Sequence, residues 1–272
     1  MAIYDYSGNA VKCIKCINHR GYMTEAPENT LPAYELSAQH GFKFVETDIS
    51  FTSDNVAVLL HDATIDRTSD GTGNITDLTY AQVLEYDFGS WFSEDFAGTK
   101  IPTLAQFLDL CVLRGFHPYL ELKNNATYTR AQIQAVVDMV HARNLDVTYI
   151  SFSAIFLGYV RDYDSSARLG FLVSSLTASS ITTVQGLMTN GNEVFLDSKV
   201  YGSSVITLCR NANIPLEIWT LTDLSTIPNL NSYISGATAN SGTPTNMLSY
   251  MGVMDYSGIK QAYVRNADGH FL

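Results

Sequence analysis

The sequence predicts an α/β fold, a closed (β/α)8 barrel, from three observations. Short apolar runs alternate with helical segments along the chain, which is the order expected for a parallel sheet. Nine apolar runs are present, and one of them is too close to its predecessor to be a parallel strand. The other eight match the number of parallel strands that close a barrel. The chain has 272 residues, a length that suits one such domain. An open doubly wound sheet is the weaker alternative.

The eight predicted strands are apolar runs at 12–21, 42–51, 116–123, 146–152, 168–173, 192–198, 215–223 and 250–258. The helices predicted between them are 29–40, 103–115, 129–144, 152–163, 181–190 and 203–213. A further apolar run, 56–62, follows the second strand after a short turn. Since a parallel crossover needs about a dozen residues or more, this run is expected to form a β-hairpin that extends strand two.

Residues from about 62 to 100 interrupt the repeat and are rich in glycine, threonine, serine and aspartate. Long irregular excursions in compact folds tend to be lids or binding loops. The excursion follows His61, so we expect a small inserted cap over the barrel mouth, within a single domain that spans 1–272. Residues 235–246 are small and polar, and they predict a flexible loop.

Composition excludes several classes of protein. The formal net charge is −11 and no basic run is present, which argues against binding to nucleic acid. No apolar stretch is long enough to span a bilayer, and the N-terminus lacks the pattern of a secretory signal, so we expect no transmembrane segment and a cytoplasmic or unlocalised protein. Cys13 and Cys16 face opposite sides of a predicted strand, which favours buried free thiols over a metal or redox pair.

Two carboxylates stand one residue apart in the second predicted strand. Glu46 and Asp48 share one face of that strand, and its other face must be apolar because it packs on helices. Both side chains should therefore point into the barrel near the carboxyl end of the strand. On the next strand, Glu121 and Lys123 follow the same rule, so three carboxylates and one ammonium group are expected to converge.

Three hard oxygen ligands suit Mg²⁺ or Ca²⁺ better than zinc. The alternative is a buried ion-pair layer in which Lys123 neutralises Glu121 or Asp48. One lysine cannot neutralise three carboxylates, and an uncompensated buried charge costs several kcal/mol, which favours the divalent cation.

Two histidines and an arginine are expected at the same mouth. His19 and Arg20 end the first strand, and His61 ends the hairpin at about the level of Glu46. Histidine can act as acid or base near neutral pH, and arginine and lysine can hold phosphate oxygens. Individually, each is more often a surface cap, ion pair or turn residue; together with a divalent cation they suggest phosphate chemistry.

Eight short motifs stand in a characteristic order along the chain: HRG at 19–21, APENT at 26–30, ETD at 46–48, HD at 61–62, GTG at 71–73, IPTL at 101–104, ELK at 121–123 and WT at 219–220. Their order and spacing resemble the glycerophosphodiester phosphodiesterase family, densely over about 11–125 and more thinly afterwards.

The resemblance implies a TIM barrel with a small cap. It also implies that the protein hydrolyses a glycerol phosphodiester to glycerol 3-phosphate and an alcohol, through a cyclic phosphate. It implies one divalent cation, Mg²⁺ or Ca²⁺, and a small-molecule glycerophosphodiester as substrate. The implied metal ligands are Glu46, Asp48 and Glu121, the acid–base pair is His19 and His61, and the phosphate-binding residues are Arg20 and Lys123.

Three features bear on the substrate pocket. Trp219, Trp91 and Phe92 are candidates to line it, although ordinary packing explains aromatic residues equally well. The last predicted strand carries 253–256 where the family has T-D-x-P, a departure in the wall that receives the alcohol. Glu28 and Asn29 are interpreted as loop structure, with Asn29 capping the following helix.

Two other functions remain open at this point. A lysophospholipase D or a teichoic-acid glycerophosphodiesterase would use the same chemistry on a different leaving group. A non-catalytic barrel that binds phosphorylated glycans or lipids would be expected to lack a histidine or a metal ligand, and none is missing from this sequence.

Overall fold

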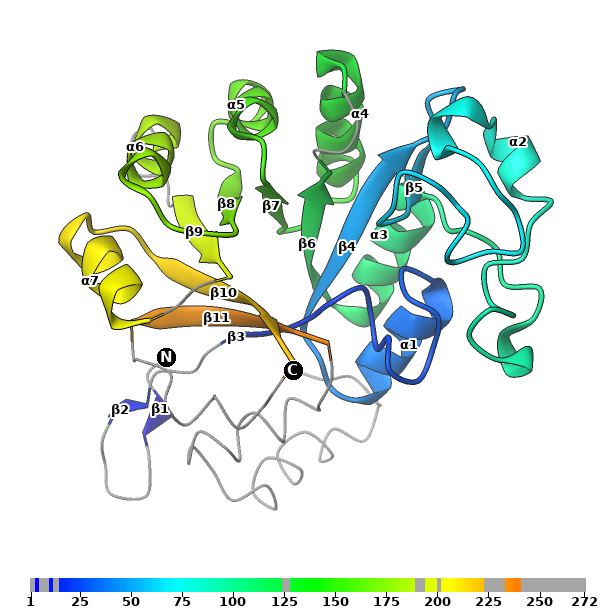
Figure 1. The fold of residues 1–272 in the computed structure, drawn as a ribbon, viewed down its shortest axis with the longest axis horizontal. Coiled ribbons are helices and arrows are strands. Elements are labelled where there is room, and N and C mark those ends of the chain that lie inside the picture. Colours follow the sequence, from blue (N-terminus) through cyan, green and yellow to red (C-terminus); the bar gives the residue numbers. More distant parts are fainter. Residues whose placement is uncertain are drawn as a thin grey trace.

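A computed structural model describes residues 3–4, 10–11, 15–123, 128–188, 194–199, 202–222 and 233–240. Within these residues, eight parallel strands form a closed ring with helices on the outside (Figure 1), as the sequence predicts. The ring order is β3, β11, β10, β9, β8, β7, β6 and β4, and β4 pairs with β3 to close it.

The strands of the ring are β3 (Lys15–Asn18), β4 (Phe44–Phe51), β6 (His117–Leu122), β7 (Thr148–Ser151), β8 (Arg168–Val173), β9 (Val194–Ser198), β10 (Leu216–Leu221) and β11 (Ile234–Ala239). Two strands of two residues each, β1 (Ile3–Tyr4) and β2 (Ala10–Val11), pair antiparallel outside the ring.

The helices that cover the ring are α1 (Leu31–Gln39), α3 (Leu104–Arg114), α4 (Arg130–His141), α5 (Ala154–Tyr163), α6 (Ala178–Leu187) and α7 (Ser203–Asn211). Threonine begins several of them. Thr103 and Thr129 form capping boxes with the glutamines three residues later, which satisfy backbone N–H groups at the starts of α3 and α4. In the described part of the chain, no helix is long and apolar enough to cross a membrane.

The predicted hairpin is confirmed. Strand β5 (Ala57–Leu59) pairs antiparallel with the end of β4, which carries His61 back toward the carboxyl end of the barrel. The following excursion contains α2 (Tyr80–Val83) and two short 3-10 helices, η1 (Ile75–Asp77) and η2 (Glu94–Phe96).

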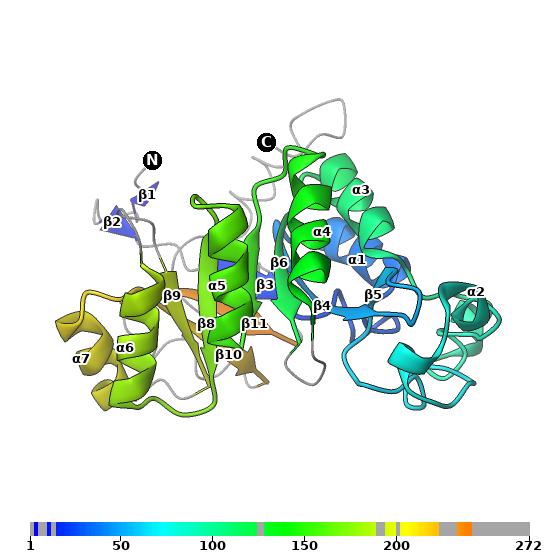
Figure 2. The same ribbon diagram turned by 90° about the horizontal axis from the view of Figure 1, so that it is seen from above.

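The excursion has a small apolar core of its own, formed by Val58, Leu60, Ile65, Ile75, Val83, Phe88 and Ile101. Figure 2 places α2 to one side of the barrel, beyond β5. The described residues that line the pocket at the mouth include none from 63–100. The excursion reaches the site through Arg67, which donates hydrogen bonds to Glu28 and Asp62, and a cap over the mouth stays a prediction.

The strand that closes the barrel is β11, which lies in the stretch that the sequence predicts as a flexible loop. One of its small residues, Gly236, has a packing reason. A Cβ atom on Gly236 would lie 2.7 Å from Cδ of Glu217, a carboxylate that fills the barrel interior from β10. Because a strand without bulky apolar residues reads as a loop, β11 escaped prediction. The predicted strand 250–258 lies outside the described residues.

Gly236→Ala is expected to destabilise the protein by about 1–3 kcal/mol, the usual cost of overpacking a core. Glu217 cannot move away freely, because it is buried and accepts hydrogen bonds from Lys15 at 2.7 Å and Tyr119 at 3.0 Å. Gly158→Ala is the matched control, since nothing lies within 4 Å of its added Cβ in α5; it should be neutral or stabilising by up to about 1 kcal/mol. Urea unfolding of both variants measures the difference, and equal stabilities would contradict this packing.

The lower interior of the ring is filled by a separate apolar cluster of Ile17, Tyr119, Ile150, Leu172 and Phe195. All five side chains are buried. This cluster forms a floor, so that the polar side chains nearer the carboxyl ends of the strands face one pocket above it.

Candidate active site

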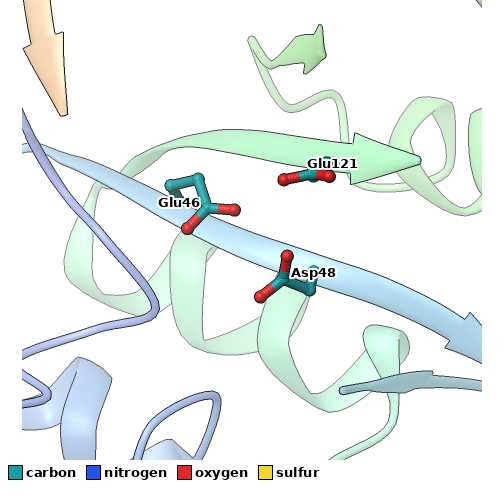
Figure 3. A group of neighbouring side chains, drawn as sticks. All are labelled: Glu46, Asp48 and Glu121. Carbon is teal, nitrogen blue, oxygen red and sulfur yellow. The ribbon is translucent and has the colours of Figure 1, made fainter. Parts of the chain in front are cut away.

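Glu46, Asp48 and Glu121 come together inside the barrel. In Figure 3, the first two project from β4 and the third from β6, and the carboxylates face a common space. One oxygen from each lies within 4.8 Å of the others, and all three side chains are buried. Strand alternation places Glu46 and Asp48 on one face, and the pairing of Asp48 with Glu121 sets the level of the third carboxylate.

Asp48 is the most heavily bonded of the three. Lys123 Nζ lies 3.2 Å from its Oδ1, and Arg20 Nε lies 3.2 Å from its Oδ2. Asn29 Nδ2 donates a hydrogen bond to Oδ2 at 2.8 Å. Burial opposes ionisation, but Lys123 and Arg20 outweigh it and hold the pKa of Asp48 below its ordinary value. Asp48 is therefore ionised at neutral pH.

The other two carboxylates lack such compensation. Burial, reinforced by Asp48 and Glu121, raises the pKa of Glu46 well above its usual range. Burial and Asp48 raise the pKa of Glu121 to about 7, although Lys123 Nζ lies 2.9 Å away. Glu46 Oε1 is buried without a hydrogen bond, and Lys123 Nζ is shared between Asp48 Oδ1 at 3.2 Å and Glu121 Oε1 at 2.9 Å. Such oxygens, clustered around excess negative charge, fit a hard divalent cation, and the three residues can hold one.

The affinity for a divalent cation is expected to rise with pH through about 7, because the ion must displace the proton from Glu121, whose pKa is about 7. In the metal-free protein, this raised pKa favours folding below the ordinary value of 4.5, and that contribution is lost as pH rises through about 7. The increase in melting temperature on adding Mg²⁺ or Ca²⁺ should therefore be larger at about pH 8 than at about pH 6. A pH-independent increase would contradict the assignment, and Glu121→Gln should reduce the pH dependence.

The two histidines have different hydrogen-bond partners. His19 Nδ1 donates to the side-chain oxygen of Asn240 at 2.6 Å, which leaves Nε2 as an acceptor 3.8 Å from Glu46 Oε2. Burial and the charge of Arg20 lower the pKa of His19 to about 4. His61 Nδ1 donates to Asp62 Oδ1 at 2.6 Å. Burial also lowers the pKa of His61, while the Asp62 carboxylate opposes that effect.

A pocket of about 280 Å³ gathers most of the predicted site at the carboxyl ends of the strands. Its lining includes His19, Arg20, Glu46, His61, Glu121, Lys123 and Trp219. Asp48 lies directly behind them, bonded to Arg20. Trp91 and Phe92 are not among the residues that line it; they contact each other edge to face on the excursion, which agrees with ordinary packing, the alternative given for them above.

Sequence reasoning missed a layer of residues that hold the site together. The predicted cap of α1 is wrong, since Thr30, not Asn29, caps this helix and accepts from the Ala33 N–H. Asn29 has a φ of 56°, which turns its side chain toward Asp48. Its amide oxygen accepts from Tyr34 at 3.0 Å and Thr47 at 3.1 Å.

Arg67 links the excursion to both halves of the site. It donates to both oxygens of Glu28 at 2.8 Å, and Glu28 Oε1 in turn accepts from Arg20 Nη1 at 2.9 Å. Arg67 Nε also donates to Asp62 Oδ2 at 2.7 Å, and Asp62 orients His61. One guanidinium group therefore fixes the partner of Arg20 and the partner of His61. Glu28 belongs to the PENT motif and Asp62 to the HD motif. The spacing of these motifs in the sequence does not show that Arg67 bonds both.

Arg67→Met is expected to lower kcat about ten- to a hundredfold in a hydrolysis assay, because small misplacements of catalytic groups and lost supporting contacts have effects of that size. Arg67→Lys should recover part of the loss. The control is Arg130→Met, which removes an exposed ion pair with Asp162 away from the pocket and should leave kcat unchanged. Equal activities of the Arg67 and Arg130 variants would contradict the link.

Fold and site together define a class: TIM barrels with a pocket of carboxylates, histidines and cationic side chains at the carboxyl ends of their strands. The family model of the glycerophosphoryl diester phosphodiesterase family matches residues 19–235. The chain belongs to this family, which confirms the resemblance recognised in its motifs.

Individual relatives agree. The chain is 42% identical over 115 residues to glycerophosphodiester phosphodiesterase 1 of Homo sapiens, a match that covers 42% of this chain and 35% of that protein. It is 30% identical over 158 residues to a glycerophosphodiester phosphodiesterase of Caldanaerobacter subterraneus subsp. tengcongensis, covering 57% of this chain and 65% of the relative. The chain thus spans about a third of the length of the human relative and under two thirds of the bacterial one.

Among solved structures, an Oleispira antarctica phosphodiesterase in complex with its product sn-glycerol-3-phosphate superposes with a TM-score of 0.78 at 24% sequence identity. The match covers 88% of this chain and 96% of that one. At this identity the likeness establishes the fold, and it agrees with the TIM barrel predicted from the sequence.

Proposed function

We propose that this protein hydrolyses glycerophosphodiesters to glycerol 3-phosphate and an alcohol. The observation that carries the proposal is the convergence, in one pocket, of a carboxylate cation site, two histidines and two cationic side chains. Family membership and the names of the relatives support the same reaction, as does the sn-glycerol-3-phosphate product of the Oleispira antarctica phosphodiesterase.

Glu46, Asp48 and Glu121 would hold one divalent cation, Mg²⁺ or Ca²⁺, since three carboxylates without sulfur or nitrogen ligands favour hard ions. When bound, the ion would supply positive charge against the phosphate oxygens. Arg20 and Lys123 would hold the remaining nonbridging oxygens. Arg20 is positioned for this role by Glu28, and Lys123 by Glu121 and Asp48.

The histidines would move the protons. His19 faces the pocket with a free Nε2 lone pair, so it would act as the base that accepts the proton of the attacking glycerol hydroxyl. That oxygen forms a bond to phosphorus as the bond to the alcohol oxygen breaks. His61 is paired with the carboxylate of Asp62, which stabilises its protonated form, so it would protonate the leaving alkoxide. The cyclic phosphate is then opened by water, with the two roles reversed.

Release of glycerol 3-phosphate from glycerophosphocholine and glycerophosphoethanolamine tests the proposal, with Mg²⁺, with Ca²⁺ and with chelator. We expect turnover that requires one of the two ions and disappears with chelator. Release of the alcohol from longer-chain substrates instead would point to a lysophospholipase D. Folded protein that binds glycerol 3-phosphate but turns over no diester would favour a binding barrel and overturn the proposal.

A further inference from the structure

Asp197 places a fourth carboxyl group in the wall of the same pocket. It lies on β9, which is four strands from β4 in either direction around the ring. The side chain therefore faces the pocket from the side opposite Glu46 and Asp48. It is 1% exposed and belongs to none of the contacts that hold the cation site or the histidines.

The carboxyl group of Asp197 has no partner among the described residues. Its Oδ1 is buried without a hydrogen bond, which ordinarily costs about 1–3 kcal/mol. Trp219 Nε1 donates at 3.0 Å to the backbone oxygen of Asp197 and leaves the carboxyl group unpaired. The nearby ammonium group of Lys15 is already committed to Glu217 at 2.7 Å. A buried polar group left in this state indicates a ligand that completes it.

The protonation state of Asp197 narrows the chemistry of that ligand. Burial and the neighbouring Glu217 and Glu121 carboxylates raise the pKa of Asp197 well above its usual range. This direction favours the protonated carboxyl group, which has one O–H donor and acceptor oxygens. A hydroxyl group is complementary to it, whereas a phosphate is better served by Arg20 and Lys123 across the pocket.

Apolar side chains form part of the pocket wall that Asp197 shares. Ile150, Leu172, Phe152 and Trp219 line the pocket, and the last two contact each other edge to face. An arm of the substrate lying against them would bury its carbon atoms, and the carboxyl group of Asp197 would meet its hydroxyl group beside the hydroxyl groups of Thr220 and Thr238. Such a site fixes a short carbon chain by one well-placed hydrogen bond.

We propose that Asp197 is a specificity-determining residue that binds the terminal hydroxyl group of the glycerol arm of the substrate. The inference rests on the proposed function, because it assumes a glycerol phosphodiester in this pocket. The buried position favours the glycerol arm, which every such substrate shares, over the variable alcohol, which needs an open subsite. Asp197 thereby selects for glycerol and contributes nothing to the proton transfers.

Calorimetric titration tests this contact with two probes, glycerol 3-phosphate and 2-hydroxypropyl phosphate, which lacks only the terminal hydroxyl group. The wild-type protein, loaded with Mg²⁺ or Ca²⁺, should bind glycerol 3-phosphate about tenfold more tightly, the effect of one good hydrogen bond. Asp197→Leu should bind both probes equally and should leave the affinity for 2-hydroxypropyl phosphate unchanged. Asp197→Asn, which keeps a donor and an acceptor, should retain most of the preference.

Several outcomes would overturn the inference. The inference is wrong if the wild-type protein binds the two probes equally. It is also wrong if Asp197→Leu keeps the tenfold preference for glycerol 3-phosphate. If Asp197→Asn loses the preference as fully as Asp197→Leu, an ionised carboxylate is required and the neutral-acid contact is wrong. If Asp197→Leu instead impairs hydrolysis of glycerophosphoethanolamine but not of glycerophosphoglycerol, the residue contacts a cationic head group.

The proposed function and this inference fail separately. Discrimination between the probes that depends on Asp197, without turnover of any diester, would retain the subsite and reject the enzyme. Metal-dependent turnover with unchanged discrimination in Asp197→Leu would retain the enzyme and reject the subsite. Thermal unfolding of each variant identifies any loss of folding, and Asp197→Ala serves as a second apolar replacement.

Discussion

Glu46→Gln is expected to reduce metal-dependent release of glycerol 3-phosphate by at least about a thousandfold, equivalent to about 4 kcal/mol of transition-state stabilisation. The substitution removes one of three buried carboxylates that face a common space. Glutamine has nearly the same shape and can still accept the hydrogen bond that the Arg20 backbone N–H donates to Glu46 at 3.0 Å. The local structure should therefore survive, and the loss should fall on cation binding.

Glu25→Gln is the matched control for this prediction. It also removes one negative charge, but its side chain is 58% exposed and lies outside the pocket. Titration with Mg²⁺ or Ca²⁺ should show weaker binding for the Glu46 variant alone. A Glu46 variant that keeps more than about a tenth of wild-type turnover with normal cation affinity would show that the three carboxylates are only an ion-pair layer around Lys123.

Replacement of either histidine by alanine should lower kcat by about 10²- to 10⁴-fold, the usual contribution of a positioned acid or base. The hydrogen-bond partners then separate the two roles. His61 is paired with Asp62 at 2.6 Å, so it should act as the acid, and its loss should be largely compensated by a p-nitrophenyl leaving group that needs no proton. His19 should act as the base, and its alanine variant should gain nothing from that substrate.

Cation affinity is the control for both histidine variants, since neither residue belongs to the carboxylate cluster. Recovery of the His19 variant by the p-nitrophenyl substrate, with no recovery of the His61 variant, would reverse the assignment of acid and base. Recovery of neither would argue that neither transfers a proton to the leaving group.

Side-chain periodicity and strand order were enough to predict the positions of the carboxylates and the hairpin. Alternation on β4 placed Glu46 and Asp48 in the interior, and the turn after that strand required the hairpin to β5. Both rules are local, and the structure follows them. The neighbouring positions of β4 and β6 then brought Glu121 to the same level.

The features that escaped prediction depend on contacts between distant residues. Strand β11 has a glycine at position 236 because Glu217 occupies the space beside it, which no local pattern reports. Arg67 and Glu28 are 39 positions apart and meet only because the excursion folds back. The left-handed backbone at Arg20, with a φ of 56°, directs its N–H to Glu46, yet arginine gives no sign of this conformation.

The apolar floor beneath the pocket leaves the carboxyl ends of the strands as the side from which the pocket opens. Ile17, Tyr119 and Phe195 close its lower end, and all are buried. In the proposed hydrolysis, a diester and both products would pass the same rim. The glycerol arm, held against the floor in our proposal, would leave last, so we expect the alcohol to depart first and glycerol 3-phosphate to compete with incoming substrate.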